Sequence, residues 1–138
     1  MLLLNKPLMR QVRVTKEQLQ TTIDEENEEL KRRLETYRGD RDPIEVSGRL
    51  VIVVDDGLAT GGTVRAAAGA LQHLGAGSLV LAVPVGSPRT VEELSPLFAD
   101  IVCLETPATF WAIGQFYADF AQTTDEEVVR LLAGRTDV

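Results

Sequence analysis

The chain has 138 residues, of which 44% are hydrophobic and 25% are charged, a balance that excludes wholesale disorder. Its 14 Lys and Arg against 21 Asp and Glu leave a net charge of −7, which argues against a nucleic-acid binder, since such a protein presents a basic surface. The length suits a single domain, in which we expect an N-terminal helical region over about residues 1–45 and an α/β core over about residues 49–138.

The first clear helix signal begins at Thr15. The sequence TKEQ at residues 15–18 has the form of a capping box, in which a hydroxyl and a glutamine side chain satisfy free backbone groups at the helix start. One apolar face follows at helical spacing and consists of Leu19, Ile23, Leu30 and Leu34. Two ion pairs at i,i+4 spacing are expected as well, Glu28 with Arg32 and Glu29 with Arg33. The acidic run is therefore interpreted as a solvated helix face.

Strands and helices alternate after an exposed loop at residues 37–43. Residues 50–54 (LVIVV) predict a strand that is buried on both faces. The later elements are expected to be a helix from residue 62 or 63 to 74 with Gly75 as its stop, a strand 79–83 ended by Pro84, a helix 90–97, a strand 101–104 and a helix through 132 capped by Thr124. This order predicts right-handed parallel crossovers, and so an α/β fold with a parallel sheet and flanking helices.

Two adjacent carboxylates, Asp55 and Asp56, follow the first predicted strand. In open parallel sheets, ligands bind at the carboxyl ends of the strands. The carboxylates suit hydroxyl groups, which donate hydrogen bonds, or a divalent cation with its waters.

A TGGT turn at residues 60–63 begins the next helix. Gly61 and Gly62 let the backbone approach a ligand closely, and the free amides at the helix start carry partial positive charge. Hydroxyl donors come from Thr60 and Thr63, so the turn suits a phosphate monoester without a lysine. A phosphate on one side and vicinal hydroxyls on the other describe a ribose 5-phosphate.

Simpler and rival interpretations exist for the same segment. In the simplest, Thr63 only caps the helix and the Asp-Asp-Gly sequence only turns the chain. A Walker-type loop would need a lysine after its glycines, and a dinucleotide-binding fold would have glycines directly after its first strand. A receiver domain would place an aspartate and a lysine at the ends of later strands, whereas no lysine follows Lys31. These three alternative folds fit less well.

The sequence VVDDGLATGGT at residues 53–63 closely resembles the phosphoribosyl pyrophosphate (PRPP) motif of type I phosphoribosyltransferases. The resemblance is to a bacterial group within that family and runs from about residue 5 to 132. It also includes Arg33, the sequence YRG at residues 37–39, VPVGSP at 83–88 and FWAIGQFYADF at 110–120. It implies a Rossmann-like fold of the phosphoribosyltransferase type, truncated because the family's upstream turn that grips pyrophosphate is expected to be missing from this chain.

The resemblance also implies roles for individual residues. Asp55 and Asp56 would hold the ribose 2- and 3-hydroxyls, near the Mg²⁺ that accompanies pyrophosphate. The 5-phosphate would lie in a cradle made of Ala59, Thr60, Gly61, Gly62 and Thr63. A nitrogenous base would attack the anomeric carbon as pyrophosphate leaves, and nearby negative charge would stabilise the oxocarbenium-like state. The alternative is a non-catalytic module that binds phosphoribosyl nucleotides.

Outside the motif, three side chains are candidates for the site. Arg38 lies roughly where the family has a mobile catalytic loop, and its guanidinium suits pyrophosphate. Phe110 and Trp111 follow a strand end, where they could stack on a base, although core packing is the simpler role.

The remaining expectations concern the setting of the protein. The partners are a small-molecule substrate (PRPP or a nucleoside monophosphate, and a base) and a second copy of the chain in a homodimer, with contacts in residues 1–40, but no nucleic acid and no membrane. The lone Cys103 is expected to be a buried structural thiol. Residues 1–4 are too short for a leader, so a cytoplasmic location is expected.

Overall fold

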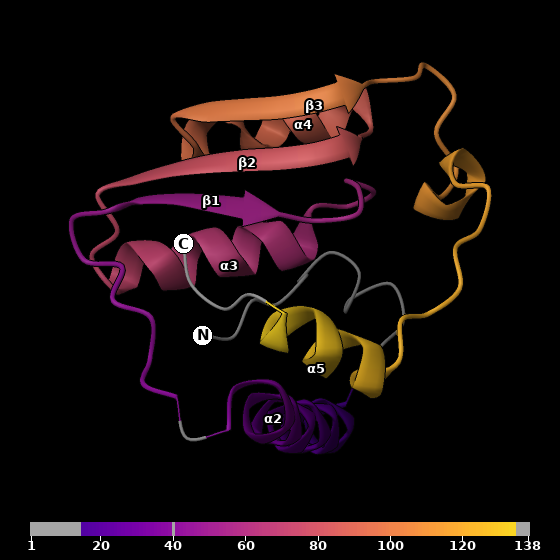
Figure 1. The fold of residues 1–138 in the computed structure, drawn as a ribbon. Helices are drawn as coiled ribbons and strands as arrows, with labels where there is room; N and C mark the ends of the chain where they lie inside the picture. Colours follow the sequence, from indigo (N-terminus) through magenta and orange to yellow (C-terminus); the bar gives the residue numbers. More distant parts are fainter. Residues whose placement is uncertain (1–14, 40, 135–138) are drawn as a thin grey trace. The chain divides into compact units, whose positions relative to one another are not determined.

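The computed structural model describes residues 15–39 and 41–134 (Figure 1). Its described residues divide into two compact units. The α/β unit holds residues 44–120, and the helical unit holds residues 15–39, 41–43 and 121–134. The expectations for residues 1–4 and part of the expected dimer contact lie outside the described residues, and the single-domain interpretation stays a prediction.

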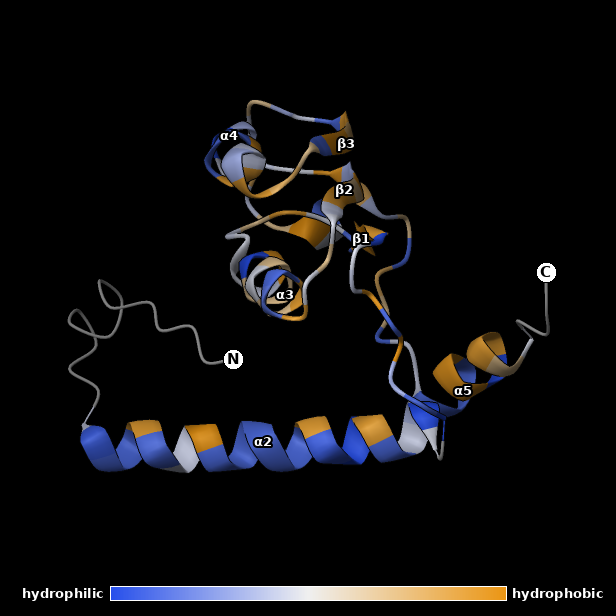
Figure 2. Cartoon of the chain, turned by 90° about the vertical axis from the view of Figure 1, so that its left-hand side faces the viewer, coloured by the Kyte–Doolittle hydropathy of each residue, from blue (hydrophilic) through white to orange (hydrophobic). Residues whose placement is uncertain are grey.

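The helical unit is built on α2 (Lys16–Arg38), a helix of 23 residues. Thr15 is its N-cap and forms the predicted capping box with Gln18. The helix runs four residues past the predicted apolar face and ends at Gly39, whose φ of 53° is disfavoured for other residues. Figure 2 shows the apolar positions along one side of an otherwise hydrophilic helix. No helix in the described part of the chain is both long and apolar enough to cross a membrane.

Helix α5 (Asp125–Ala133) contacts α2 through polar side chains. Thr124 caps it, and Glu127 completes the capping box. Arg32 and the Tyr37 hydroxyl, both from α2, donate hydrogen bonds to the carboxylate of Asp125. These contacts lower the pKa of Asp125, with the Arg32 hydrogen bond as the largest cause.

The ion pairs of α2 differ in part from those predicted. Arg33 pairs with Glu29 at 2.7 Å as expected. Arg32 pairs with Glu29 as well, at 2.7 Å, and not with Glu28. The reason is that Arg32 also reaches Asp125 on α5, a long-range contact that local spacing does not reveal.

Three parallel strands form the sheet of the α/β unit, in the order β1-β2-β3. Their bounds are β1 (Leu50–Val54), β2 (Ser78–Val85) and β3 (Asp100–Glu105). The crossovers carry α3 (Gly62–His73) and α4 (Pro88–Leu94), the latter followed by the 3-10 helix η1 (Ser95–Leu97). The predicted α/β class and parallel sheet are thereby confirmed.

Both crossover helices cover the same face of the sheet (Figure 2). The core lies on that face and includes Leu58, Val64, Ala68, Leu79, Leu81, Val83, Leu94 and Phe98. On the other face, large apolar side chains of the two outer strands are exposed, namely Leu50, Ile52, Val54, Val102 and Leu104. The prediction that strand 50–54 is buried on both faces is therefore wrong for the described structure. An apolar run does not distinguish a covered face from an open one.

Pro84 does not end the second strand, as the sequence predicted, but lies inside β2. A proline in a central strand removes a ladder hydrogen bond, because it has no N–H to donate. Here β1 leaves the ladder at this level, after Val54 pairs with Ala82 and the Asp55 amide donates to the Ala82 carbonyl. Pro84 therefore lies beyond the last residue pair between β1 and β2.

We predict that Asp125→Asn destabilises the helical unit at neutral pH and that the effect disappears in acid. Because the folded-state pKa of Asp125 lies below its ordinary value of 3.8, its carboxylate stabilises the fold above that value. The contribution is lost as the pH falls through the lowered pKa. Thermal melts followed by circular dichroism at pH 7 and below the lowered pKa would measure the difference.

Glu126→Gln is the matched control, since it removes the same charge in the same helical turn without breaking the contact with α2. Equal melting temperatures for the two variants at pH 7 would contradict the stabilising role of Asp125.

Candidate functional site

The candidate site begins where β1 leaves the sheet. After Val54, the chain makes a short excursion and rejoins β2 at Leu58, whose amide donates to the Val85 carbonyl at 2.9 Å. The Leu58 carbonyl then accepts from the Ser87 amide at 2.9 Å, and its side chain is 1% exposed. Pairing of Val54 with Ala82 fixes one end of the excursion and the buried Leu58 fixes the other, so that residues 56–57 lie outside the ladder at the carboxyl end of the sheet.

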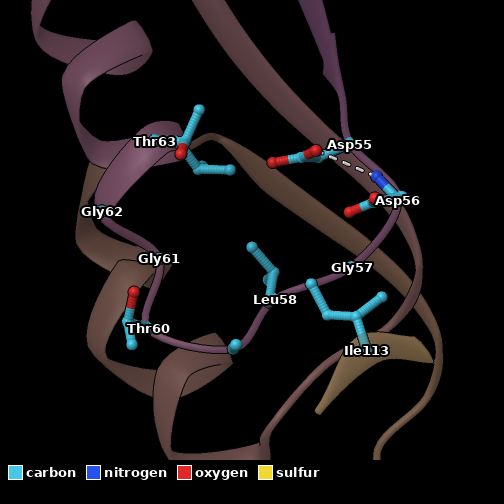
Figure 3. A pocket seen from close by; sticks show the side chains of 11 residues that line it. Asp55, Asp56, Gly57, Leu58, Thr60, Gly61, Gly62, Thr63 and Ile113 are labelled. Carbon is cyan, nitrogen blue, oxygen red and sulfur yellow. Dashed lines mark hydrogen bonds between the residues drawn. The ribbon is translucent and has the colours of Figure 1, made fainter. Parts of the chain in front are cut away.

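The two carboxylates lie on this excursion. Figure 3 shows Asp55 and Asp56 extending toward the loop that precedes α3. The Asp56 amide donates to Oδ1 of Asp55 at 3.0 Å, which orients the first carboxylate. Partial burial raises the pKa of Asp55 above its ordinary value, and the charge of Asp56 adds to the rise, while the hydrogen bond from the Asp56 amide opposes it. The surroundings of Asp55 therefore disfavour its ionised form, and a cation or hydroxyl donors nearby would favour that form.

The predicted phosphate loop forms the N-terminus of α3. Gly61 is the N-cap, with φ 70° and ψ 12°, and no side chain caps the helix. Thr63 is thus not a helix cap, and the simple interpretation of that residue is wrong. The first amides of an α-helix have no partner within the helix, so those of α3 remain available to an anion.

Helix α4 holds this loop from the core side. The buried Thr90 hydroxyl donates to the Ala59 carbonyl at 2.7 Å. A Cβ on Gly61 would lie 2.9 Å from Cγ2 of Thr90 and 3.0 Å from Cδ1 of Leu94. Only glycine fits there, both for its positive φ and for the space below it. The sequence analysis did not identify Thr90, because nothing local connects it to a loop 31 residues away.

A hollow of about 180 Å³ lies between the acidic turn and the loop (Figure 3). One continuous stretch, residues 55–64, lines it together with Ile113. This stretch contains all seven residues predicted for the acidic pair and the phosphate cradle: Asp55, Asp56, Ala59, Thr60, Gly61, Gly62 and Thr63. None of the lining residues carries a positive charge, so an anion would be held there by backbone amides and hydroxyls.

The predicted aromatic residues do not line this hollow. Phe110 contacts Phe116, with ring centroids 5.2 Å apart, and neither ring belongs to the described core, so both roles considered for Phe110 stay predictions. Trp111 is 85% exposed. Ile113, which the sequence analysis missed, lines the hollow and packs on Gly57, where a Cβ would lie 2.9 Å from Cγ2 of Ile113. It lies in the 3-10 helix η2 (Ile113–Phe116), whose place no periodicity predicts.

Arg38 belongs to the helical unit and not to the α/β unit that holds the hollow. It lines a second hollow of about 240 Å³, together with Leu34, Glu35, Gly39, Arg41 and Pro43. Its guanidinium donates to the Asp42 carbonyl. The catalytic role predicted for Arg38 stays a prediction.

Cys103 is half-buried on β3, with its thiol 3.3 Å from the Glu105 carbonyl. Burial raises the pKa of this thiol, and the nearby Glu105 charge adds to the rise. A raised pKa disfavours the reactive thiolate, but the thiol is less buried than the sequence predicted, and its structural role stays a prediction.

A glycine-containing loop thus faces paired carboxylates at the carboxyl end of a parallel sheet, the place where open α/β folds bind their ligands. The chain belongs to the phosphoribosyl transferase domain family, whose model matches residues 3–121. The resemblance found in the sequence is thereby confirmed.

Relatives and a solved structure agree with this assignment. The chain is 47% identical over 104 residues to "Putative phosphoribosyl transferase Rv0571c" of Mycobacterium tuberculosis H37Rv, and equally to "Putative phosphoribosyl transferase MT0597" of strain CDC 1551. The match covers 75% of this chain but 24% of each relative. The crystal structure of TT1426 from Thermus thermophilus is similar, with 35% identity and a TM-score of 0.75, over 97% of this chain and 63% of that one.

We predict that Gly61→Ala destabilises the α/β unit, whereas Gly62→Ala does not. A side chain at Gly61 meets Thr90 and Leu94 and has to adopt a positive φ, which together cost on the order of 1–3 kcal/mol. At Gly62 the nearest atom to a new Cβ is 3.8 Å away. Urea unfolding of both variants measures the difference, and equal stabilities would show that the loop tolerates a side chain at its N-cap.

We also predict that Asp55→Asn raises the free energy of unfolding at neutral pH. The raised pKa means that the folded state binds more protons than the unfolded state just above 3.8, so wild-type stability falls as the pH rises through that window. The gain from the neutral amide is therefore larger at pH 7 than below pH 3.8. Asp56→Asn, at a more exposed position, serves as the control in urea unfolding at both pH values. A stabilisation that does not depend on pH would contradict this account.

Proposed function

We propose that the hollow binds the ribose 5-phosphate group of PRPP. We further propose that the protein transfers this group to or from a nitrogenous base, with pyrophosphate as the leaving group. The observation behind the proposal is the single stretch of residues 55–64, which sets two carboxylates across a small hollow from an uncapped helix N-terminus. Hydroxyl donors suit the first group and a phosphate suits the second. A ribose 5-phosphate has both at its two ends.

On the phosphate side, the amides at the start of α3 are the proposed donors, with the hydroxyls of Thr60 and Thr63 beside them. The αL conformation of Gly61 turns the chain into the helix, and the Ala59 carbonyl accepts its hydrogen bond from Thr90 on α4. A phosphate needs no lysine in this arrangement, because the helix terminus supplies the partial positive charge.

On the sugar side, Asp55 and Asp56 are the proposed acceptors for the ribose 2- and 3-hydroxyls. The described residues contain no cluster of three or more His, Cys, Asp or Glu side chains that could hold a metal ion by themselves. Two carboxylates fit Mg²⁺ in another way, since this ion is commonly held by one or two carboxylates together with substrate phosphates and water. The Mg²⁺ of the reaction would thus arrive with the pyrophosphate group and meet Asp55 or Asp56 directly or through water.

The transfer itself forms a bond from a nitrogen of the base to the anomeric carbon and breaks the bond from that carbon to pyrophosphate. The negative charge of Asp55 and Asp56 would stabilise the positive charge that develops on the ribose. Pockets for drug-sized ligands span about 300–1,000 Å³, so a hollow of about 180 Å³ suits the sugar phosphate and leaves the base outside it. The exposed ring of Trp111 is the proposed surface for the base.

A second candidate is a module that binds phosphoribosyl nucleotides without turnover. The observation that favours it is the lining of the hollow, which has no cationic side chain for a pyrophosphate group. The chain also spans about a quarter of the length of the curated relatives that it matches, so the activity of a whole protein is itself a proposal. A homodimer and a cytoplasmic location belong to both candidates as predictions.

Calorimetric titration with Mg²⁺ and PRPP, with ribose 5-phosphate and with inorganic phosphate tests the binding proposal. We expect the double variant Asp55→Asn with Asp56→Asn to weaken ribose 5-phosphate at least tenfold, because hydrogen bonds to charged groups contribute roughly 1.5–3 kcal/mol each. Its affinity for inorganic phosphate should be retained. The double variant Asp100→Asn with Glu92→Gln, two exposed acids of β3 and α4, is the matched control for net charge.

Release of pyrophosphate from PRPP in the presence of purine and pyrimidine bases separates the two candidates. Turnover supports the transferase, and binding without turnover supports the module. Equal losses for both phosphate ligands in the double variant would refute the role given to the two carboxylates.

A further inference from the structure

The hydroxyl of Tyr117 contacts the backbone of the acidic turn. It donates a hydrogen bond to the carbonyl of Asp56, with an oxygen-to-oxygen distance of 2.7 Å, across 61 residues of sequence. Tyr117 does not line the hollow, and the hydrogen bond to Asp56 connects it to a residue that does. Both residues belong to the α/β unit.

The hydrogen bond from Tyr117 is made at a point where β1 is no longer paired with β2. Asp56 lies on the excursion between Val54 and Leu58, where the ladder between β1 and β2 is interrupted. Its amide is held by the Asp55 carboxylate and its carbonyl by the Tyr117 hydroxyl. Two side chains therefore bond to the backbone groups of Asp56 where the ladder does not.

Side-chain contacts within segment 106–120 brace the part of the chain that carries Tyr117. The Gln115 side chain accepts from the amides of Trp111 and Ala112, at 3.1 and 3.2 Å, and donates to the Thr109 carbonyl at 3.3 Å. The Tyr117 ring packs against Phe120, with centroids 5.1 Å apart.

The same segment reaches the acidic turn at a second point. Ile113 packs so closely on Gly57 that a Cβ there would lie 2.9 Å from it. The Tyr117 hydroxyl is therefore carried by a segment that is itself held by packing and hydrogen bonds. A residue can orient a binding group only if its own position is fixed in this way.

We propose that Tyr117 is a positioning residue that orients Asp56 toward the ribose hydroxyls and thereby couples segment 106–120 to the sugar side of the site. The inference rests on the proposed function, since it assigns a role within the same hollow. It assigns no role to Tyr117 on the phosphate side, where Thr90 holds the loop instead. Loss of the hydroxyl should consequently affect the two ends of the ligand differently.

Tyr117→Phe is the test, because it removes the hydroxyl and keeps the ring on Phe120. We expect its affinity for ribose 5-phosphate, measured by titration calorimetry, to fall about two- to tenfold, the range for one hydrogen bond. Its affinity for inorganic phosphate should equal that of the wild type. Tyr37→Phe is the matched control, because the hydroxyl of that other tyrosine bonds to Asp125 in the helical unit. It should change neither affinity.

A measurement without ligand accompanies the titrations. Hydrogen exchange of the peptide that contains residues 55–58 should be faster in Tyr117→Phe than in the wild type, with the exchange of β2 unchanged. Circular dichroism melts show whether the variant is folded at the working temperature.

Unchanged binding of ribose 5-phosphate, or equal losses for both ligands, would overturn the positioning role even though the hollow binds sugar phosphates. A wild type that binds neither ligand would overturn the proposed function, and the positioning role with it. In that case, the exchange data still report whether the hydroxyl holds the acidic turn, so the two failures are distinguishable.

Discussion

The interruption of the ladder between Val54 and Leu58 is the feature on which the candidate site depends. The chain returns to β2 at Leu58, whose amide donates to the Val85 carbonyl and whose carbonyl accepts from the Ser87 amide. The Leu58 side chain is 1% exposed. Burial of a leucine stabilises a fold by roughly 1.5–3 kcal/mol, so this return is strongly held. The residues between Val54 and Leu58 do not continue the strand pairing. The two carboxylates consequently lie at the carboxyl end of the sheet, where ligands bind in open α/β folds.

Two side chains from later in the chain hold the two sides of the hollow, and both act on backbone carbonyls. Thr90 bonds to Ala59 on the loop side, and Tyr117 bonds to Asp56 on the acidic side. Supports of this kind leave the amides of α3 and the carboxylates themselves available to a ligand. They also place the support for the site in α4 and in segment 106–120, which carry none of the residues proposed to bind ribose or phosphate.

The sheet of the α/β unit has one packed face and one open face. Parallel sheets are ordinarily covered on both faces, because their crossover helices lie on either side. Here α3 and α4 lie on the same side, and apolar residues such as Ile52 and Leu104 remain exposed on the other, with 59% and 73% of their surface accessible. Two residues of the core on the packed face, Leu58 and Val64, also line the hollow, which lies at the carboxyl end of the sheet.

Much of this protein follows from local sequence, and the rest depends on contacts between distant residues. The capping boxes at Thr15 and Thr124, the three apolar strands and the acidic pair before the glycine turn act over a few residues, so their pattern predicts them. Other features depend on residues far away in the chain. These are the pairing of Arg32 with Asp125 and the contacts of Thr90, Ile113 and Tyr117. The exposure of one face of β1 and the continuation of β2 through Pro84 likewise depend on what packs or pairs beside each strand. The sequence therefore determined which groups the site contains, because periodicity and turn chemistry are local. Only the tertiary structure decided what holds those groups in place, because packing and long-range hydrogen bonds leave no periodic trace in the residues that make them.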